Sequence, residues 1–162
     1  MKSSLQSEGQ MDAIDRKLLH HLQQHGRWSF AELARRVKLT TPAVIERVRK
    51  LEAAGIITGY RAEVSAAKMG LPVLAFIRMS VVGDVFAKVA AVVKDAPEVL
   101  ECHRGTGSDS FIMKVAVRSA QHLESLIDRL TPYGTTSTSV VLSSPVKHRD
   151  LEPWGSEGRD QA

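Results

Sequence analysis

The sequence predicts an α+β chain in which three short helices precede a β-α-β-β-α-β segment. Two observations carry this prediction. Apolar residues recur at helical spacing before residue 56, and strand-like apolar runs alternate with two helical runs after residue 70. Its 162 residues, 43% hydrophobic and 25% charged, suffice for one core of ordinary size or two small ones. We therefore expect domains over 10–58 and 71–150, joined by a linker strand and loop over 59–70.

Three helix starts can be read in the first part. Asp12 is placed to cap the first helix, and Ser29 with Glu32 forms a capping-box pattern at the start of the second. Thr41 before Pro42 predicts the third start, a capping hydroxyl followed by proline at the first helical position. Glycines at 26 and 55 are placed to end the first and third helices.

The second and third helices are separated by only four residues, VKLT at 37–40, which predicts a helix-turn-helix. We expect the domain to be of the winged type. Val44, Val48 and Leu51 share one face of the third helix, which we expect to pack on the other two. Ala43, Arg47 and Lys50 then lie on another face. A recognition helix needs this division, because its polar face enters the major groove of DNA.

Positive charge is concentrated in this same part. Residues 1–60 carry ten Lys/Arg against six Asp/Glu, a net charge of +4, whereas residues 61–162 carry twelve of each. Seven of the bases lie within 27–50, beside only two acids. A confined basic patch favours a polyanionic partner, here double-stranded DNA, although a solvated helical face would carry the same charges.

The second part has the order of a ferredoxin-like, split βαβ domain. We expect strands over 71–80, 98–104, 111–119 and 135–144, and helices over 85–97 and 120–130. Both alternating residue sets of the first strand are apolar, but two helices cover only one face of a sheet. The other face predicts a homodimer. The polar tail 151–162 is expected to be flexible.

The remaining features favour a cytoplasmic protein without metal or cofactor. The single cysteine, Cys102, fits a reducing compartment, and neither a signal peptide nor a membrane span is predicted. His21 and His25 have a spacing that can bind metal, but no third ligand is evident nearby, which favours a solvated pair.

Residues 105–111, GTGSDSF, form a glycine-rich loop between two predicted strands. A phosphate cradle requires its glycines to lead into a helix, whereas this loop leads into a strand. A nucleophilic site requires a base and an orienting residue, and Cys102 and His103 point to opposite faces of their strand. Two interpretations remain open: a simple hairpin turn, or a pocket in which N–H groups and hydroxyls receive a carboxylate and Asp109 receives an ammonium.

The phrases ELARRVKLT, PAVIERVRKLEAAGIITGY and ECHRGTGSDSFIMKVAV occur in an order and spacing that resemble the Lrp/AsnC (feast/famine) transcriptional regulators, over about residues 12–150. The resemblance implies a cytoplasmic DNA-binding regulator with a RAM/ACT-like second domain, dimers formed through the bridging strand and the sheet domain, further assembly into tetramers or octamers, and a small-molecule effector, typically an amino acid. It places DNA contacts at Ser29, Thr40, Thr41, Arg47, Arg49 and Lys50. It places effector contacts at Gly105, Thr106, Gly107, Ser108, Asp109, Ser110, Thr136 and Thr138.

The loop departs from the family in one respect. Many members carry acids where this chain has Ser108 and Ser110, and here the acid, Asp109, lies between them. A different effector, or none, would follow, and with it an alternative function as an architectural DNA-binding protein. Siroheme decarboxylases share the fold, but they do not need a basic recognition helix, so an enzyme is not expected.

Overall fold

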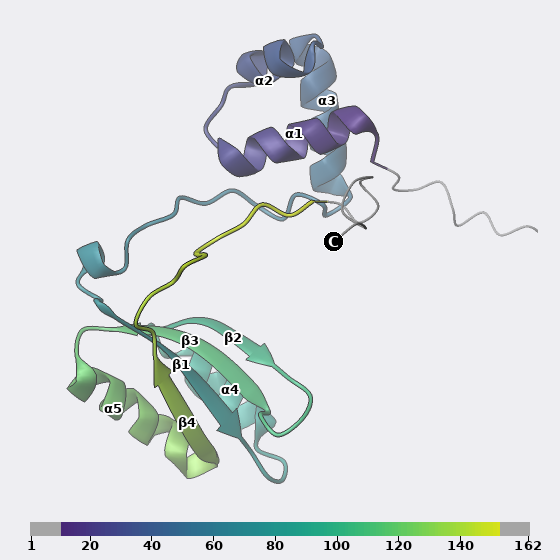
Figure 1. Cartoon of the computed structure of the whole chain (residues 1–162). Helices are drawn as coiled ribbons and strands as arrows, with labels where there is room; N and C mark the ends of the chain where they lie inside the picture. Colours follow the sequence, from purple (N-terminus) through teal and green to yellow (C-terminus); the bar gives the residue numbers. More distant parts are fainter. Residues whose placement is uncertain (1–10, 153–162) are drawn as a thin grey trace, which may run out of the picture. The chain divides into compact units, whose positions relative to one another are not determined.

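The computed structural model describes residues 11–152 (Figure 1). Two compact units are present: one combines the residues up to 62 with those from 146 onward, and the other is formed by residues 63–145. Residues 146–150, which were expected to belong to the second domain, group with the first unit. Of the expected flexible tail, residues 153–162 lie outside the described residues.

The first unit contains three helices, α1 (Ala13–Gln24), α2 (Phe30–Val37) and α3 (Thr41–Ala53). Their apolar sides form one core, whose fully buried members include Leu18, Leu33, Val44 and Val48. The predicted inner face of α3 is confirmed, because Val44, Val48 and Leu51 are only 0%, 1% and 4% exposed. The opposite face of α3 is thereby left toward solvent.

The start of α1 is capped as predicted. The Asp12 carboxylate accepts hydrogen bonds from the backbone N–H groups of Ile14 and Asp15, both at 2.8 Å. The Asp15 carboxylate accepts one in return from the Asp12 N–H. At α2 only half of the predicted box forms: Ser29 accepts from the Glu32 N–H at 3.2 Å, but the Glu32 carboxylate turns to arginines instead.

The predicted cap of α3 was wrong by one residue. Thr40 is the N-cap residue, Thr41 is the first helical residue, and no hydroxyl caps the helix. Pro42, at the second helical position, removes one of the two N–H groups from which a capping hydroxyl can accept. The Thr40 hydroxyl is left exposed at the end of the helix.

The second unit has the predicted order: β1 (Val73–Ser80), α4 (Phe86–Lys94), β2 (Val99–Arg104), β3 (Phe111–Val117), α5 (Ala120–Leu130) and β4 (Thr135–Val140). The strands form one antiparallel sheet in the order β2-β3-β1-β4, and α4 and α5 pack on one of its faces (Figure 1). The α+β fold class and the ferredoxin-like arrangement are confirmed.

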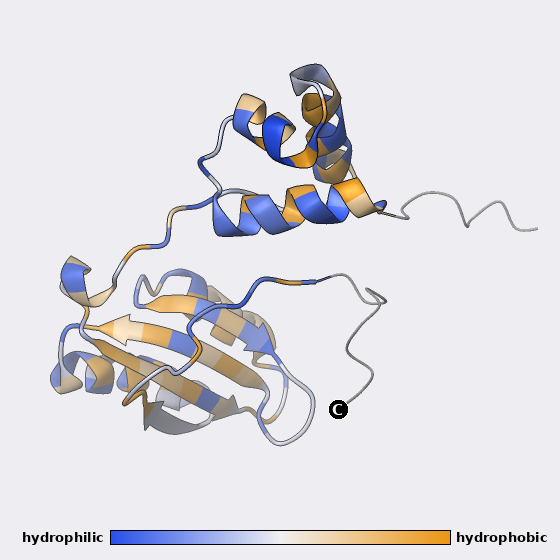
Figure 2. Cartoon of the chain, turned by 45° about the horizontal axis from the view of Figure 1, so that its top comes forward, coloured by the Kyte–Doolittle hydropathy of each residue, from blue (hydrophilic) through white to orange (hydrophobic). Residues whose placement is uncertain are grey.

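The two faces of the sheet differ in exposure. On β1, Ala75, Ile77 and Met79 are 0% exposed beneath the helices, whereas Phe76, between them, is 40% exposed. Ile112 on β3 is also 40% exposed and lies opposite Arg78, on the same face as Phe76. Apolar residues run along these strands (Figure 2), and Phe76 and Ile112 keep apolar side chains exposed on the face without helices, which also carries Arg78 and Lys114.

Glu98 fastens the start of β2 to α5. Its Oε1 lies 2.7 Å from Arg129 Nη2 and 2.9 Å from His122 Nε2. Burial alone would raise the pKa of this carboxyl, but the hydrogen bonds from Arg129, from the backbone and from His122 outweigh burial and lower the pKa to about 2. The carboxylate is therefore charged in the folded protein at neutral pH.

The linker strand expected after α3 is not formed. From residue 56 to residue 72 the chain makes turns and one short helix, η1 (Ala67–Met69), but no strand. A strand requires a neighbour for its N–H and C=O groups, and no other segment of the described chain pairs with this one.

Candidate DNA interface and effector loop

The turn between α2 and α3 is held by Lys38, which adopts a left-handed backbone conformation with φ of 58°. Its neighbour Leu39 donates a backbone hydrogen bond to the Ala34 carbonyl at 3.0 Å. This tight closure confirms the predicted helix-turn-helix connection. It places Thr40 at the entrance of α3, three residues after Val37, the last residue of α2.

Three predicted hydroxyl contacts lie at helix starts. Ser29 is exposed, and its oxygen is used by the α2 cap, so its O–H remains available as a donor to a phosphate. Thr40 is exposed and Thr41 is half-buried. Backbone and hydroxyl donors at helix N-termini are common phosphate contacts in DNA complexes.

Arg47 does not have the open position predicted for it. Its Nη1 lies 2.7 Å from Asp12 Oδ2 and 2.7 Å from Asp15 Oδ1, and 31% of its side chain is exposed. The two carboxylates, that of Asp15 first, raise the pKa of Arg47, while the Asp15 backbone N–H and Arg47 lower the pKa of Asp12. Arg47 thus joins α3 to the start of α1, so its side chain is paired rather than free, and its contact with DNA stays a prediction.

Arg49 and Lys50 keep the positions predicted for them. Both are exposed, and Arg49 forms no ion pair among the described residues. Lys50 lies 3.7 Å from Glu46, one turn earlier, but it is 74% exposed. An exposed pair of this kind is weak, so a phosphate can displace Glu46.

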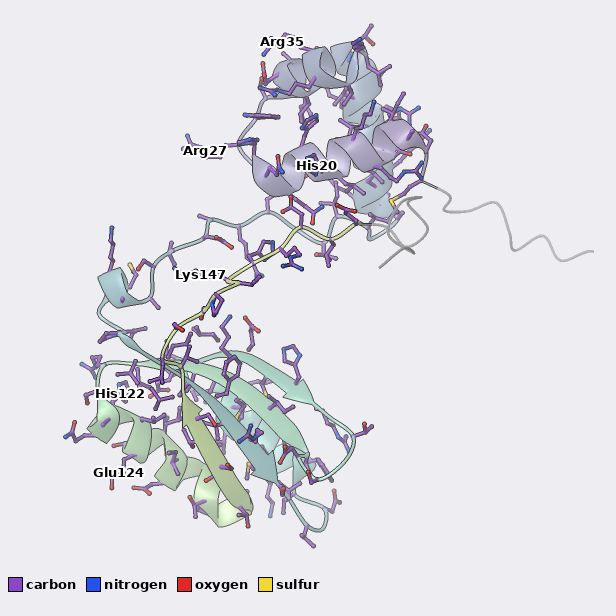
Figure 3. All side chains as sticks on the ribbon, viewed as in Figure 1. His20, Arg27, Arg35, His122, Glu124 and Lys147 are labelled. Carbon is purple, nitrogen blue, oxygen red and sulfur yellow. The ribbon has the colours of Figure 1, made fainter. Side chains whose placement is uncertain are left out.

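Sequence reasoning missed a cation-aromatic cluster beside α2. The Arg36 guanidinium lies 3.9 Å from the Trp28 ring centre, and the His25 ring stacks on Trp28 at 4.1 Å. Arg35 and Arg36 both bind Glu32, and their hydrogen bonds lower its pKa to about 2. Part of the basic segment is therefore neutralised internally, whereas Arg27 carries no ion pair among the described residues and points outward beside it (Figure 3).

The GTGSDSF loop joins β2 to β3 and is tied to the end of β1. Ser110 donates its backbone N–H to the Met79 carbonyl at 2.8 Å, and its hydroxyl accepts from the Val81 N–H at 3.3 Å. The Ser80 hydroxyl donates to the Ser108 carbonyl. Gly107 has φ of 99°, a conformation that side chains rarely adopt, so glycine is required there. With both of these hydrogen bonds, Ser110 serves to hold the loop against β1.

The remaining predicted effector residues lie at two places. Thr106, Gly107 and Ser108 are exposed at the loop tip with Gly105, and Asp109 is half-buried without an ion pair among the described residues. Thr136 and Thr138 are half-buried on β4 and pair in register with Met79 and Ile77 of β1. Among residues 11–152 no hydrogen bond connects the loop to either threonine. The loop alone therefore offers an acid, hydroxyls and backbone N–H groups for a polar ligand.

Candidate membrane-spanning helices and metal-binding clusters are both absent from the described residues. None of the helices among residues 11–152 has the length and apolar character needed to cross a bilayer. His, Cys, Asp and Glu side chains in the described part of the chain form no cluster that could hold a metal ion.

Comparison with known proteins supports this division of the chain. Residues 11–52 match the AsnC-type helix-turn-helix domain, and residues 74–151 match the Lrp/AsnC ligand binding domain. An uncharacterized HTH-type transcriptional regulator of Bacillus subtilis is 42% identical over 85% of this chain and 98% of its own. The regulator LrpC of the same organism is 34% identical over 82% of this chain and 92% of its own.

Solved structures agree. Bacillus subtilis LrpC superimposes with a TM-score of 0.82 at 32% identity, over 86% of this chain and all of that chain. A transcriptional regulator of Neisseria meningitidis in complex with L-methionine gives a TM-score of 0.82 at 30% identity, over 88% of this chain and 96% of that chain. The chain, with its helix-turn-helix and its ferredoxin-like ligand-binding domain, belongs to the Lrp/AsnC family of transcriptional regulators.

Proposed function

We propose that this protein is a cytoplasmic, sequence-specific DNA-binding regulator rather than an enzyme, and that α3 is its recognition helix. The proposal rests on the exposed start of α3, where threonine hydroxyls are available. The same helix also carries Arg49, which has no ion pair among the described residues, and Lys50, whose ion pair is weak. The proposed DNA contacts are Ser29, Thr40, Thr41, Arg49 and Lys50. Arg47 holds the helix in place, and its contact with DNA stays a prediction.

Selection of bound duplexes from a random pool, followed by fluorescence anisotropy, tests this proposal. We expect near-palindromic sites with half-sites about 10 bp apart, since a dimer places two recognition helices in successive major grooves. Binding that stays sequence-tolerant, with only a steep salt dependence, would favour the architectural alternative.

We further propose that two chains associate through the sheet face that carries Phe76 and Ile112. Among residues 11–152 no helix covers this face, and both side chains are 40% exposed. Burying such a face against a second copy removes apolar surface from water. The bridging segment at 56–72 would gain the hydrogen-bonding partner that it lacks in one chain. Tetramers or octamers would need contacts beyond this face.

For the effector we propose an amino acid or a related metabolite bound at the hairpin loop. The residues that would contact it are Gly105, Thr106, Gly107, Ser108 and Asp109. Ser110, Thr136 and Thr138 would form the surrounding wall of the site. Support comes from relatives of known structure, two of which are described as complexes with L-methionine. The test is a thermal-shift titration with L-methionine and the other common amino acids. A rise in Tm that Asp109→Ala abolishes is expected, and a response unchanged by that substitution would remove the loop from the site.

A further inference from the structure

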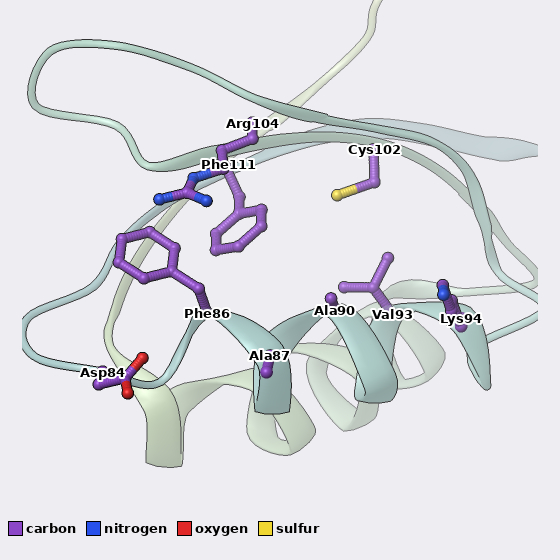
Figure 4. Close-up of a pocket in the computed structure, with 9 residues that line it drawn as sticks. All are labelled: Asp84, Phe86, Ala87, Ala90, Val93, Lys94, Cys102, Arg104 and Phe111. Atoms are coloured by element: carbon purple, nitrogen blue, oxygen red, sulfur yellow. The ribbon is translucent and has the colours of Figure 1, made fainter.

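Between α4 and β2 lies a groove of about 720 Å³ that no residue of the 105–110 loop lines. Cys102, on β2, faces Ala90 and Val93, on α4, across it (Figure 4). The space exists because α4 presents alanines, at 87 and 90, where larger side chains would fill the gap to the sheet. Its size is within the range of small-molecule sites, about 300–1,000 Å³.

The floor of the groove is apolar. Phe111 and Val93 are 5% and 8% exposed, and the Phe86 and Phe111 rings lie 5.8 Å apart at one end. Cys102 is half-buried, and burial raises the pKa of its thiol, so the thiol is neutral at pH 7. A ligand in this space would meet hydrocarbon, aromatic faces and an uncharged sulfur.

One cation defines an end of the groove. The Arg104 guanidinium lies over the Phe86 ring, 4.0 Å from its centre, and forms no ion pair among the described residues. A guanidinium held over a ring still has N–H groups for a carboxylate, which its fork of donors matches. Lys94 lies at the other end (Figure 4). Among the described residues that line the groove, Asp84, beside Phe86, is the only acid.

We propose that this groove is a ligand site for a small amphiphilic carboxylate, whose carboxylate binds Arg104 and whose apolar body lies between α4 and β2. The site is separate from the hairpin loop, and it rests on the proposed small-molecule response of this unit. Two sources share the chemistry: an apolar amino acid, whose ammonium Asp84 would receive, and an amine-free acid with the same body.

Cys102 provides the assay, because it is the only cysteine of the chain. The rate of its alkylation by N-ethylmaleimide, followed by intact mass, is measured with two matched series of probes. One series is L-leucine, isocaproate and isoamylamine, and the other is L-phenylalanine, hydrocinnamate and phenethylamine. We expect a carboxylate of at least one series to slow alkylation about tenfold at about ten times its Kd, since only the free groove reacts, and the amines to have no effect.

Protection by the amino acid alone identifies an amino acid as the ligand, and protection by the amine-free acid identifies a simple carboxylate. Calorimetry with the best probe then compares variants, because a substitution in the groove could itself alter thiol access. Ala90→Leu fills the groove and should abolish binding, whereas Ala91→Leu, one residue on along α4 and outside the groove, should retain it. Arg104→Gln should remove most of the affinity without blocking the space.

Absence of protection by all four carboxylates overturns the site, and so does binding that survives both Ala90→Leu and Arg104→Gln. Binding lost only in Asp109→Ala would place the ligand at the hairpin loop, which refutes the groove and leaves the proposed function standing. Failure of the unliganded protein to bind DNA specifically would refute the proposed function independently of the groove.

Discussion

Arg47 and Arg49 are two residues apart on α3 but have different surroundings. Arg47 bridges two carboxylates of the α1 cap, at 2.7 Å each, whereas Arg49 is exposed without an ion pair among the described residues. The Arg47 contacts could not be predicted, because they depend on where the start of α1 lies relative to α3 in three dimensions. Helical spacing identified only the face from which Arg47 projects.

This difference predicts opposite effects of two alanine substitutions. Arg47→Ala should lower the free energy of unfolding by about 1 kcal/mol, since a partly exposed three-member network is lost. Arg49→Ala should change stability by less than about 0.5 kcal/mol. It should nevertheless weaken binding to all DNA sequences and reduce the slope of log K against log salt by about 1. Urea denaturation and anisotropy titrations measure these quantities. Unchanged stability with lost DNA binding in Arg47→Ala would favour its predicted contact with DNA.

A second residue-level prediction concerns Lys38, whose φ of 58° is the only left-handed value of a non-glycine residue among residues 11–152. Lys38→Gly should raise the free energy of unfolding by about 1 kcal/mol, because glycine adopts this conformation without steric cost. Lys50→Gly, the same replacement within α3, should lower it by about 1 kcal/mol. Urea denaturation compares the two variants, and a fall in stability for Lys38→Gly would contradict the assignment of strain.

At the scale of elements, features that depend on local sequence were predicted, whereas features that depend on contacts between distant segments were not. The limits of α5 were predicted correctly from the spacing of its leucines, and the antiparallel strands followed from apolar runs near their observed limits. The strand expected after α3 does not form, because a strand needs a neighbouring strand for its hydrogen bonds, and sequence periodicity does not reveal whether one is present. The α4–β2 groove was also missed, since it is a space between two elements whose alanines look like ordinary helix residues.

Glu98 allows an element-level prediction on the attachment of β2 to α5. Its folded pKa of about 2 lies below the ordinary value of 4.5, so the carboxylate stabilises the fold above pH 4.5 and that stability is lost as pH falls toward 2. The loss should be on the order of 2 kcal/mol. Glu98→Gln should be less stable at pH 7 and should show a flatter decline in acid. Glu124→Gln, exposed on α5, is the matched control (Figure 3) and should behave like the parent protein in acid urea denaturation.

At the scale of the whole molecule, association should depend on the uncovered sheet face. Phe76→Glu should convert a dimer into a chain of 17.8 kDa, because it introduces charge into an apolar contact. Val82→Glu, at a residue that is 92% exposed in the turn after β1, should leave the dimer intact. Analytical ultracentrifugation distinguishes these masses. A Phe76→Glu protein that remains dimeric would place the interface elsewhere.

The chain enters and leaves the sheet of the second unit at neighbouring points, where the Val141 N–H donates to the Leu74 carbonyl at 2.8 Å. It then returns to the first unit, where the Leu151 N–H donates to the Gln23 side chain at 2.8 Å and the Gln23 amide donates back to the Leu151 carbonyl. Topologically, the sensing module is an insertion into the DNA-binding module. A domain whose two ends lie close together can be replaced by another domain with similarly placed ends. The ligand-binding domain of this chain could therefore be exchanged for another while the DNA-binding domain stays intact.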